Sequence, residues 1–248
     1  MGDQLEKLAA DERFISGIYN YCDRWCERCP QTLHCLNFSL SEEKFSDPEA
    51  RDIRNEAFWK KLSETLQEAM EMLKEAGKKW GIDIETLDSA SDTESMRAND
   101  EAAKKHVVSR AAKSYGKMVG DCFKEREGLF FETADGAPEG VDFEEALEVI
   151  QWYQYFIAAK VMRAIRGKKE EDEEEGDEFP SDSDGSAKIA LIAIDRSIGA
   201  WAVISHYDHR YAEEALRMIS LLDPLRQAIE QTFPRARPFL RPGFDRID

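Results

Sequence analysis

The chain has 248 residues, which is long enough for one large domain or two small ones with a buried core. Its net charge is −17, and the segment from Gly167 to Asp184 alone holds ten acidic residues and two lysines. Because the remainder is also acidic, the composition argues against nucleic acid as a partner. The sequence contains no apolar run that approaches the ~20 residues of a membrane span and no secretion signal. We therefore expect a cytoplasmic protein without a membrane partner.

Apolar residues recur at spacings of three and four along most of the sequence. This pattern predicts an all-α fold, a helical bundle of five to six helices. The expected helices span Leu5–Cys29, Asn55–Trp80, Asn99–Arg126, Asp142–Arg166, Ser186–His206 and Arg210–Thr232. Loops are expected from Pro30 to Asp52 and from Ser89 to Asp100. The helix over Ser186–His206 is apolar on nearly every side, which predicts a position at the centre of the bundle.

The most regular apolar positions predict the core. In the third helix they are Val108, Ala112, Tyr115, Val119 and Cys122, and in the fourth they are Phe143, Leu147, Ile150, Ile157, Val161 and Ala164. Cys122 is expected to act as a small buried hydrophobe.

The acidic segment suggests a division of the chain, because such a composition buries too little apolar area to offset its ordering entropy. Residues 167–185 are therefore expected to form a disordered linker within the bundle. Residues 1–52 are expected to form an N-terminal helix and a cysteine segment that binds metal. One bundle is expected to consist of two parts, residues 53–166 and 186–234. An extended tail with four arginines is expected over residues 235–248.

Four cysteines, Cys22, Cys26, Cys29 and Cys35, lie within fourteen residues. In a chain without a secretion signal this clustering favours metal binding over disulfides. Soft thiolate ligands select zinc, copper(I) or an iron–sulfur cluster. The alternative without a metal is four reduced cysteines packed on a helix face.

The spacing of these cysteines bears on the choice of metal. If the helix continues through Cys29, about 10 Å of helix rise separates Cys22 from Cys29. One tetrahedral zinc holds its sulfurs only about 4 Å apart, whereas a four-iron, four-sulfur (4Fe-4S) cluster is wider. The spacing therefore favours the cluster. If the helix instead ends near Cys26, Cys26-x2-Cys29 forms a knuckle that suits zinc.

The segment Cys26-x2-Cys29-Pro-x5-Cys35 resembles the four-iron cluster loop of endonuclease III-type DNA glycosylases. Only three residues separate Cys22 from Cys26, whereas that family has a wider gap before its second cysteine. The hairpin sequence and the catalytic Lys–Asp arrangement of the glycosylases are absent. The resemblance therefore implies the cofactor class, a 4Fe-4S cluster, and does not imply the glycosylase activity.

The neighbours of the cysteines suit a protected metal site. Aromatic and aliphatic side chains are expected to exclude solvent, while two arginines and the backbone N–H groups after Pro30 are expected to offset the thiolate charge. The shielding residues are Tyr19, Tyr21, Trp25, Leu36 and Phe38, and the arginines are Arg24 and Arg28. His34 is a possible alternative ligand.

Two further groups stand out. Asp195 and Arg196 interrupt the apolar fifth helix, so both need partners, for which Lys160, Arg163, Glu144 and Glu148 are candidates. We favour a buried ion-pair network there over a polar functional site in the core. His206, Asp208 and His209, with Glu213, resemble a metal-ligand cluster, but a turn in which Asp208 caps the sixth helix is the simpler interpretation.

Three hypotheses follow. In the first, a 4Fe-4S cluster serves electron transfer, redox sensing or the support of a surface that binds a protein partner. In the second, zinc stabilises an interaction module without catalytic activity. In the third, a metalloenzyme uses the bundle core around Asp195 and the turn from His206 to His209.

Overall fold

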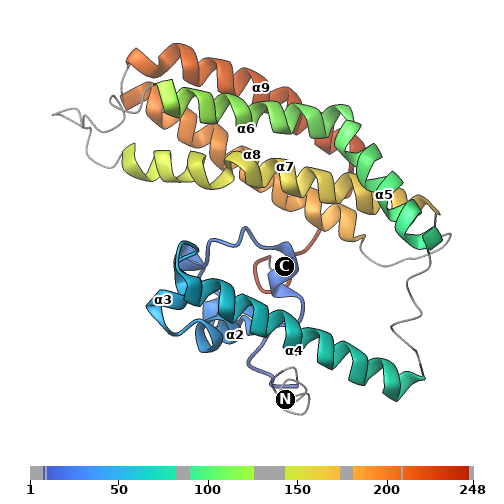
Figure 1. The fold of residues 1–248 in the computed structure, drawn as a ribbon. Coiled ribbons are helices and arrows are strands. Elements are labelled where there is room, and N and C mark those ends of the chain that lie inside the picture. The colour runs from blue at the N-terminus through green and yellow to red at the C-terminus, as the bar shows by residue number, and fades with distance from the viewer. Residues whose placement is uncertain are drawn as a thin grey trace. The chain divides into compact units, whose positions relative to one another are not determined.

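The computed structural model describes residues 8, 10–81, 90–125, 143–173, 181–207 and 209–245, and these residues form helices, turns and loops (Figure 1). No strand occurs within those ranges, which confirms the predicted all-α class. No helix in the same ranges is long and apolar enough to cross a membrane.

The chain divides into two compact units. The first comprises Met1–Arg97 together with Pro242–Asp248, and the second comprises Ala98–Arg241. The first unit therefore contains both ends of the sequence, and it includes the helix expected over Asn55–Trp80.

The described residues of the first unit include the α-helices α2 (Leu36–Lys44), α3 (Pro48–Arg51) and α4 (Glu56–Trp80). The bounds of α4 confirm the predicted helix. Asn55 caps its start by accepting a hydrogen bond from the backbone N–H of Ala57, and Gly81 ends it with a left-handed φ of 70°. Helix α3 packs against α4, and an ion pair of 2.6 Å between Lys44 and Glu68 links α2 to α4.

The predicted N-terminal helix is wrong over residues 10–29. These residues form turns and two short 3-10 helices, η1 (Ile18–Tyr21) and η2 (Cys26–Arg28), and η3 (Thr32–His34) follows them. Gly17 and Arg24 both adopt left-handed φ angles, 73° and 61°, which an α-helix cannot contain.

The predicted loop from Pro30 to Asp52 is also wrong, because it contains α2 and α3. Each of these helices begins at a side chain that accepts a backbone hydrogen bond: the Cys35 sulfur from Phe38, and the Asp47 carboxylate from Glu49.

The second unit holds four long helices that pack in a ring. They are α6 (Val107–Glu125), α7 (Phe143–Glu173), α8 (Asp182–Tyr207) and α9 (Ala212–Thr232), with η5 (His209–Tyr211) before α9. Helix α6 contacts α7 and α9, and α8 contacts the same two helices, so the four lie side by side (Figure 1). Helix α8 contributes the buried Trp201 and Ile194, but its Arg196 and Ala202 are exposed, so it forms one side of the ring and the predicted central position is wrong.

Helix α5 (Ala90–Lys105) precedes this ring and begins within the first unit. Its presence corrects the loop expected over Ser89–Asp100, of which residues 90–100 are helical. The expected third helix is divided at His106, whose ring nitrogen Nδ1 accepts a hydrogen bond of 3.3 Å from the backbone N–H of Val108. His106 thus ends one helix and caps the next.

The disordered linker expected over residues 167–185 is wrong where the structure describes it. Helix α7 continues to Glu173 and α8 begins at Asp182, while residues 174–180 lie outside the described part. Asp182 pairs with Arg163 and the buried Asp184 pairs with Arg235, each at 3.0 Å. Acidic side chains at the start of α8 also interact favourably with the helix dipole.

The two units differ in how much apolar surface they bury. Nearly all of the predicted core positions of α6 and α7 are buried, with Leu147 half-buried. In the first unit, among the described residues, only Ile18 and Ala50 are buried apolar side chains. A unit whose described residues bury so little apolar surface is expected to draw stability from another source, such as a metal, a disulfide or a partner chain.

Candidate metal centre

The four predicted ligands Cys22, Cys26, Cys29 and Cys35 line one pocket of the first unit. The pocket has a volume of about 310 Å³, which includes its opening to solvent. Tyr19, Trp25, Phe38 and Arg24, all expected near the cysteines, line the same pocket. Tyr21 and Leu36 are not among its lining residues. The thiols are free and half-buried.

Local backbone geometry turns the cysteines toward each other. Between Cys22 and Cys26, the Asp23 carboxylate accepts a hydrogen bond of 3.2 Å from the backbone N–H of Trp25, and Arg24 adopts its left-handed φ of 61°. A non-glycine residue in this region costs about 1–3 kcal/mol, and such strain is concentrated at functional sites. The guanidinium of Arg28 lies 4.2 Å from the centre of the Trp25 ring, but Arg28, unlike Arg24, is not among the residues that line the pocket.

Backbone N–H groups point at two of the sulfurs. Gln31 N–H donates to Cys29 Sγ and Phe38 N–H donates to Cys35 Sγ, each at 3.4 Å. The first of these bonds confirms the expectation that N–H groups after Pro30 face a cysteine. Hydrogen bonds of this kind stabilise the negative charge of a thiolate and orient it toward a metal.

Burial and mutual repulsion disfavour the thiolate form at two of the cysteines. Burial raises the pKa of Cys26, and the neighbouring Cys22, Cys29 and Cys35 raise it further. Burial likewise raises the pKa of Cys29. The cysteines are thus close enough to influence one another's ionisation, and a cation among them would offset this repulsion.

The far C-terminal end of the chain completes the pocket. Gln31 Nε2 donates a hydrogen bond of 2.7 Å to the carbonyl oxygen of Gly243, and Phe244 lines the pocket. Gly243 has a φ of 76°, and a Cβ on it would lie 2.8 Å from Ile18 Cδ1. Glycine is therefore required there. The Pro242-Gly243 pair signals a turn in the sequence, but nothing in the sequence assigns that turn to the cysteines.

The four sulfurs surround a space and do not converge on one point. Within the described residues, no group of three or more His, Cys, Asp or Glu side chains is arranged to hold a metal ion. His34, the possible alternative ligand, is not among the pocket's lining residues, and its Nδ1 lies 2.9 Å from the carbonyl oxygen of Arg13.

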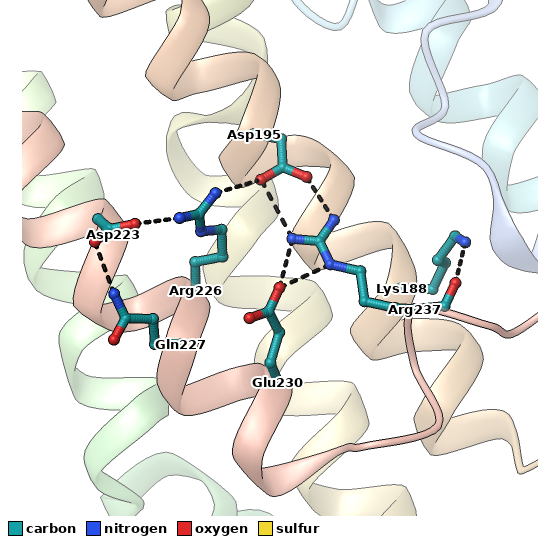
Figure 2. Close-up of polar contacts among 7 residues, drawn as sticks. All are labelled: Lys188, Asp195, Asp223, Arg226, Gln227, Glu230 and Arg237. Atoms are coloured by element: carbon teal, nitrogen blue, oxygen red, sulfur yellow. Dashed lines mark hydrogen bonds and ion pairs between the residues drawn. The ribbon is translucent and has the colours of Figure 1, made fainter.

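The polar site considered around Asp195 is a surface ion-pair network. Asp195 pairs with Arg237 at 2.6 Å and with Arg226 at 3.6 Å, and Arg237 also contacts Glu230 (Figure 2). These side chains are more than a third exposed. The favoured interpretation is therefore right that these charges pair with one another, but wrong that the network is buried, and the partners of Asp195 differ from the four candidates named above.

The remaining sequence candidates do not form a second centre in the described part of the chain. Arg196 is exposed and donates a hydrogen bond of 2.5 Å to the hydroxyl of Tyr153. His206 lies near the end of α8 and His209 begins η5. Asp208, the expected cap, falls outside the described residues. Cys122 is buried on α6, as expected.

The fold and the site together define an all-α chain with a pocket lined by four cysteines. The chain matches no protein-family model, no curated protein and no solved structure.

Proposed function

We propose that Cys22, Cys26, Cys29 and Cys35 bind one 4Fe-4S cluster, and that the cluster serves electron transfer, redox sensing or the structure of the first unit. The observation that carries the proposal is the shared pocket, in which four thiols from three turns of the chain face a common space. A reducing compartment such as the cytoplasm would keep these thiols available.

Three features support a metal over four unliganded thiols. Backbone N–H groups already point at Cys29 and Cys35. The mutual repulsion of the four sulfurs is relieved by a cation. The first unit has almost no apolar core among its described residues, and metal binding can supply folding free energy where burial does not.

We favour a cluster over a single ion because the four cysteines share a pocket without gathering as an ion site in the described residues. One zinc requires its four sulfurs to meet around a point, with Zn–S distances of about 2.3 Å. Here the sulfurs line a pocket, and no three described ligand side chains converge as an ion site. The earlier argument from helix rise no longer applies, because Cys22 and Cys29 do not share a helix.

Zinc is the second candidate because of one specific observation. Cys26 to Cys29 forms a tight turn, closed by a hydrogen bond of 3.2 Å from the N–H of Cys29 to the carbonyl of Cys26. Together with the Gln31 N–H on Cys29, this turn has the features of the knuckle expected for zinc. A zinc-stabilised module without catalytic activity is therefore the alternative function.

The test is anaerobic purification of the full chain, followed by its visible spectrum, metal content and acid-labile sulfide. A 4Fe-4S cluster gives a brown protein with four iron and four sulfide per chain, bleached by dithionite. A colourless protein with one zinc per chain would contradict the cluster and support the alternative.

Single Cys→Ala variants identify the ligands. Each change at positions 22, 26, 29 and 35 should abolish or strongly reduce metal content. Cys122→Ala is the matched control, because this fifth cysteine is buried on α6 and should leave metal content unchanged. Equal metal content in all five variants would refute the site.

A further inference from the structure

Helix α4 carries an apolar stripe that no other described part of the first unit covers. Trp59, Leu66, Leu73 and Trp80 follow one another at intervals of seven residues, with Met70 between them. Their exposed fractions are 55% for Trp59, 59% for Leu66, 50% for Met70, 55% for Leu73 and 77% for Trp80. A seven-residue apolar repeat is the pattern by which one helix packs along another.

A neighbouring side of α4 packs within the first unit. Phe58 lies 6.1 Å from the Phe45 ring, and Glu68 pairs with Lys44. The stripe is therefore a second face of the same helix. Soluble monomers rarely expose contiguous apolar patches above a few hundred Å², and larger patches mark interaction sites.

One end of the stripe is held in place before any partner binds. The indole Nε1 of Trp59 donates a hydrogen bond of 2.9 Å to the carbonyl oxygen of Ile53, and its ring meets the Phe58 ring edge to face. Ile53 is itself exposed and extends the apolar surface at this end. A fixed side chain loses little rotamer freedom on binding.

The order of the residues points to a second copy of this chain as the occupant. Trp-Leu-Leu-Trp at equal intervals reads the same in both directions. An antiparallel pair of α4 helices places Trp59 beside the partner's Trp80 and Leu66 beside the partner's Leu73. The result is an isologous two-fold interface, in which one surface meets itself. The opposed helix dipoles also favour this direction.

The area is sufficient for such a dimer. With side-chain areas of about 100 to 250 Å², the five exposed stripe residues present on the order of 500 Å² per chain. Two copies would bury about 1,000 Å² of apolar surface, which reaches the size of a specific interface before any polar flank is counted. We propose that the protein forms an antiparallel dimer through the α4 stripe.

The experiment is sedimentation equilibrium of the full, metal-loaded chain over a range of concentrations. We expect a monomer–dimer equilibrium for the natural sequence. The double variant Leu66→Glu with Leu73→Glu should raise the dimer Kd by roughly a hundredfold or more, because two charges per chain enter the apolar contact. Circular dichroism and metal content should stay unchanged, since both side chains are exposed.

Lys78→Glu is the matched control. It changes the net charge by the same amount as the double variant, but Lys78 lies on the polar side of α4 and is exposed. Its Kd should remain within about threefold of the natural value. A monomer at every concentration, or equal Kd values for the control and the double variant, would overturn the proposal.

Mixtures of single variants test the direction of pairing. Leu66→Glu mixed with Leu73→Lys should form heterodimers if the helices are antiparallel, because these two positions then lie side by side. Leu66→Glu mixed with Leu66→Lys should not. Heterodimers in the second mixture alone would overturn the antiparallel arrangement.

Discussion

Replacing Gly243 by alanine tests whether the C-terminal segment closes the cysteine pocket. The backbone φ of 76° disfavours an alanine by about 1–2 kcal/mol. The new Cβ would also lie 2.8 Å from Ile18 Cδ1 and 2.9 Å from Ile15 Cδ1. Ile18 is buried and cannot move freely, so overpacking adds about 1–3 kcal/mol. We therefore expect a total loss of about 2–5 kcal/mol in the stability of the first unit.

Gly81→Ala separates the two contributions to this loss. Gly81 has a similar φ of 70°, but a Cβ there would meet nothing within 4 Å. It should cost only the backbone share, about 1–2 kcal/mol. Urea unfolding followed by tryptophan fluorescence measures the loss of unfolding free energy in each variant. Retention of metal in the presence of a chelator measures independently whether the pocket is disturbed. If Gly243→Ala proves no worse than Gly81→Ala, the segment does not pack on Ile18 as the structure describes.

Three predictions concern the second unit. Burial raises the pKa of Tyr115 to about 12, so its neutral form stabilises the fold fully below pH 10, and this stabilisation is lost between pH 10 and 12. Absorbance at 295 nm during an alkaline titration should show Tyr115 ionising after the other tyrosines. Ionisation of Tyr115 near pH 10 would contradict this prediction. Gly116→Ala should lower the free energy of unfolding in urea by about 1–3 kcal/mol, because the new Cβ would lie 2.7 Å from the backbone oxygen of Gln154 on α7. Gly199→Ala should instead raise it by about 0.5–1 kcal/mol, because a Cβ there would enter open space on α8. Asp195→Asn should lower the free energy of unfolding by no more than about 1 kcal/mol, and the difference should vanish in 1 M salt. A larger loss would mean that the Asp195 ion pairs are buried in the core.

The parts of the fold that sequence predicts are those where local signals and packing agree. Val108, Ala112, Tyr115 and Val119 repeat with helical spacing and are buried on one side of α6. Asn55 and Gly81 mark the ends of α4 because a cap side chain and a left-handed glycine are local requirements.

The helical spacing of apolar residues gave a wrong prediction at the N-terminus, because the cysteines that line the pocket are also three and four residues apart without forming a helix. Cys22, Cys26 and Cys29 fall three and four apart, as helix positions do, but they face a shared pocket from separate turns. Counting cysteines as apolar residues therefore predicts a helix where the chain forms turns and short 3-10 helices around a pocket.

The acidic composition of residues 167–185 gave a wrong prediction of disorder, because composition does not show which side chains will pair with specific partners. The carboxylates of Asp182 and Asp184 have arginine partners at positions 163 and 235, far away in the sequence. The contact of Gly243 with the cysteine pocket is likewise a long-range interaction that sequence does not reveal. Its turn is visible in the sequence, whereas its contact with Gln31 spans 212 residues, and no local pattern encodes it.

Removing the metal should unfold one unit and spare the other. The second unit buries a continuous set of large side chains, including Trp201, Tyr115 and Tyr153, so its stability does not depend on the cysteines. The first unit, in its described residues, buries only Ile18 and Ala50 among apolar side chains, so the proposed metal would supply much of its folding free energy. Hydrogen exchange read by mass spectrometry, with and without a chelator, separates the two. Loss of protection should be confined to α2, α3 and α4, while α6 to α9 keep theirs. Unchanged protection in α2 to α4 would show that the first unit is stable without metal, and simultaneous loss in α6 to α9 would show that the two units unfold together.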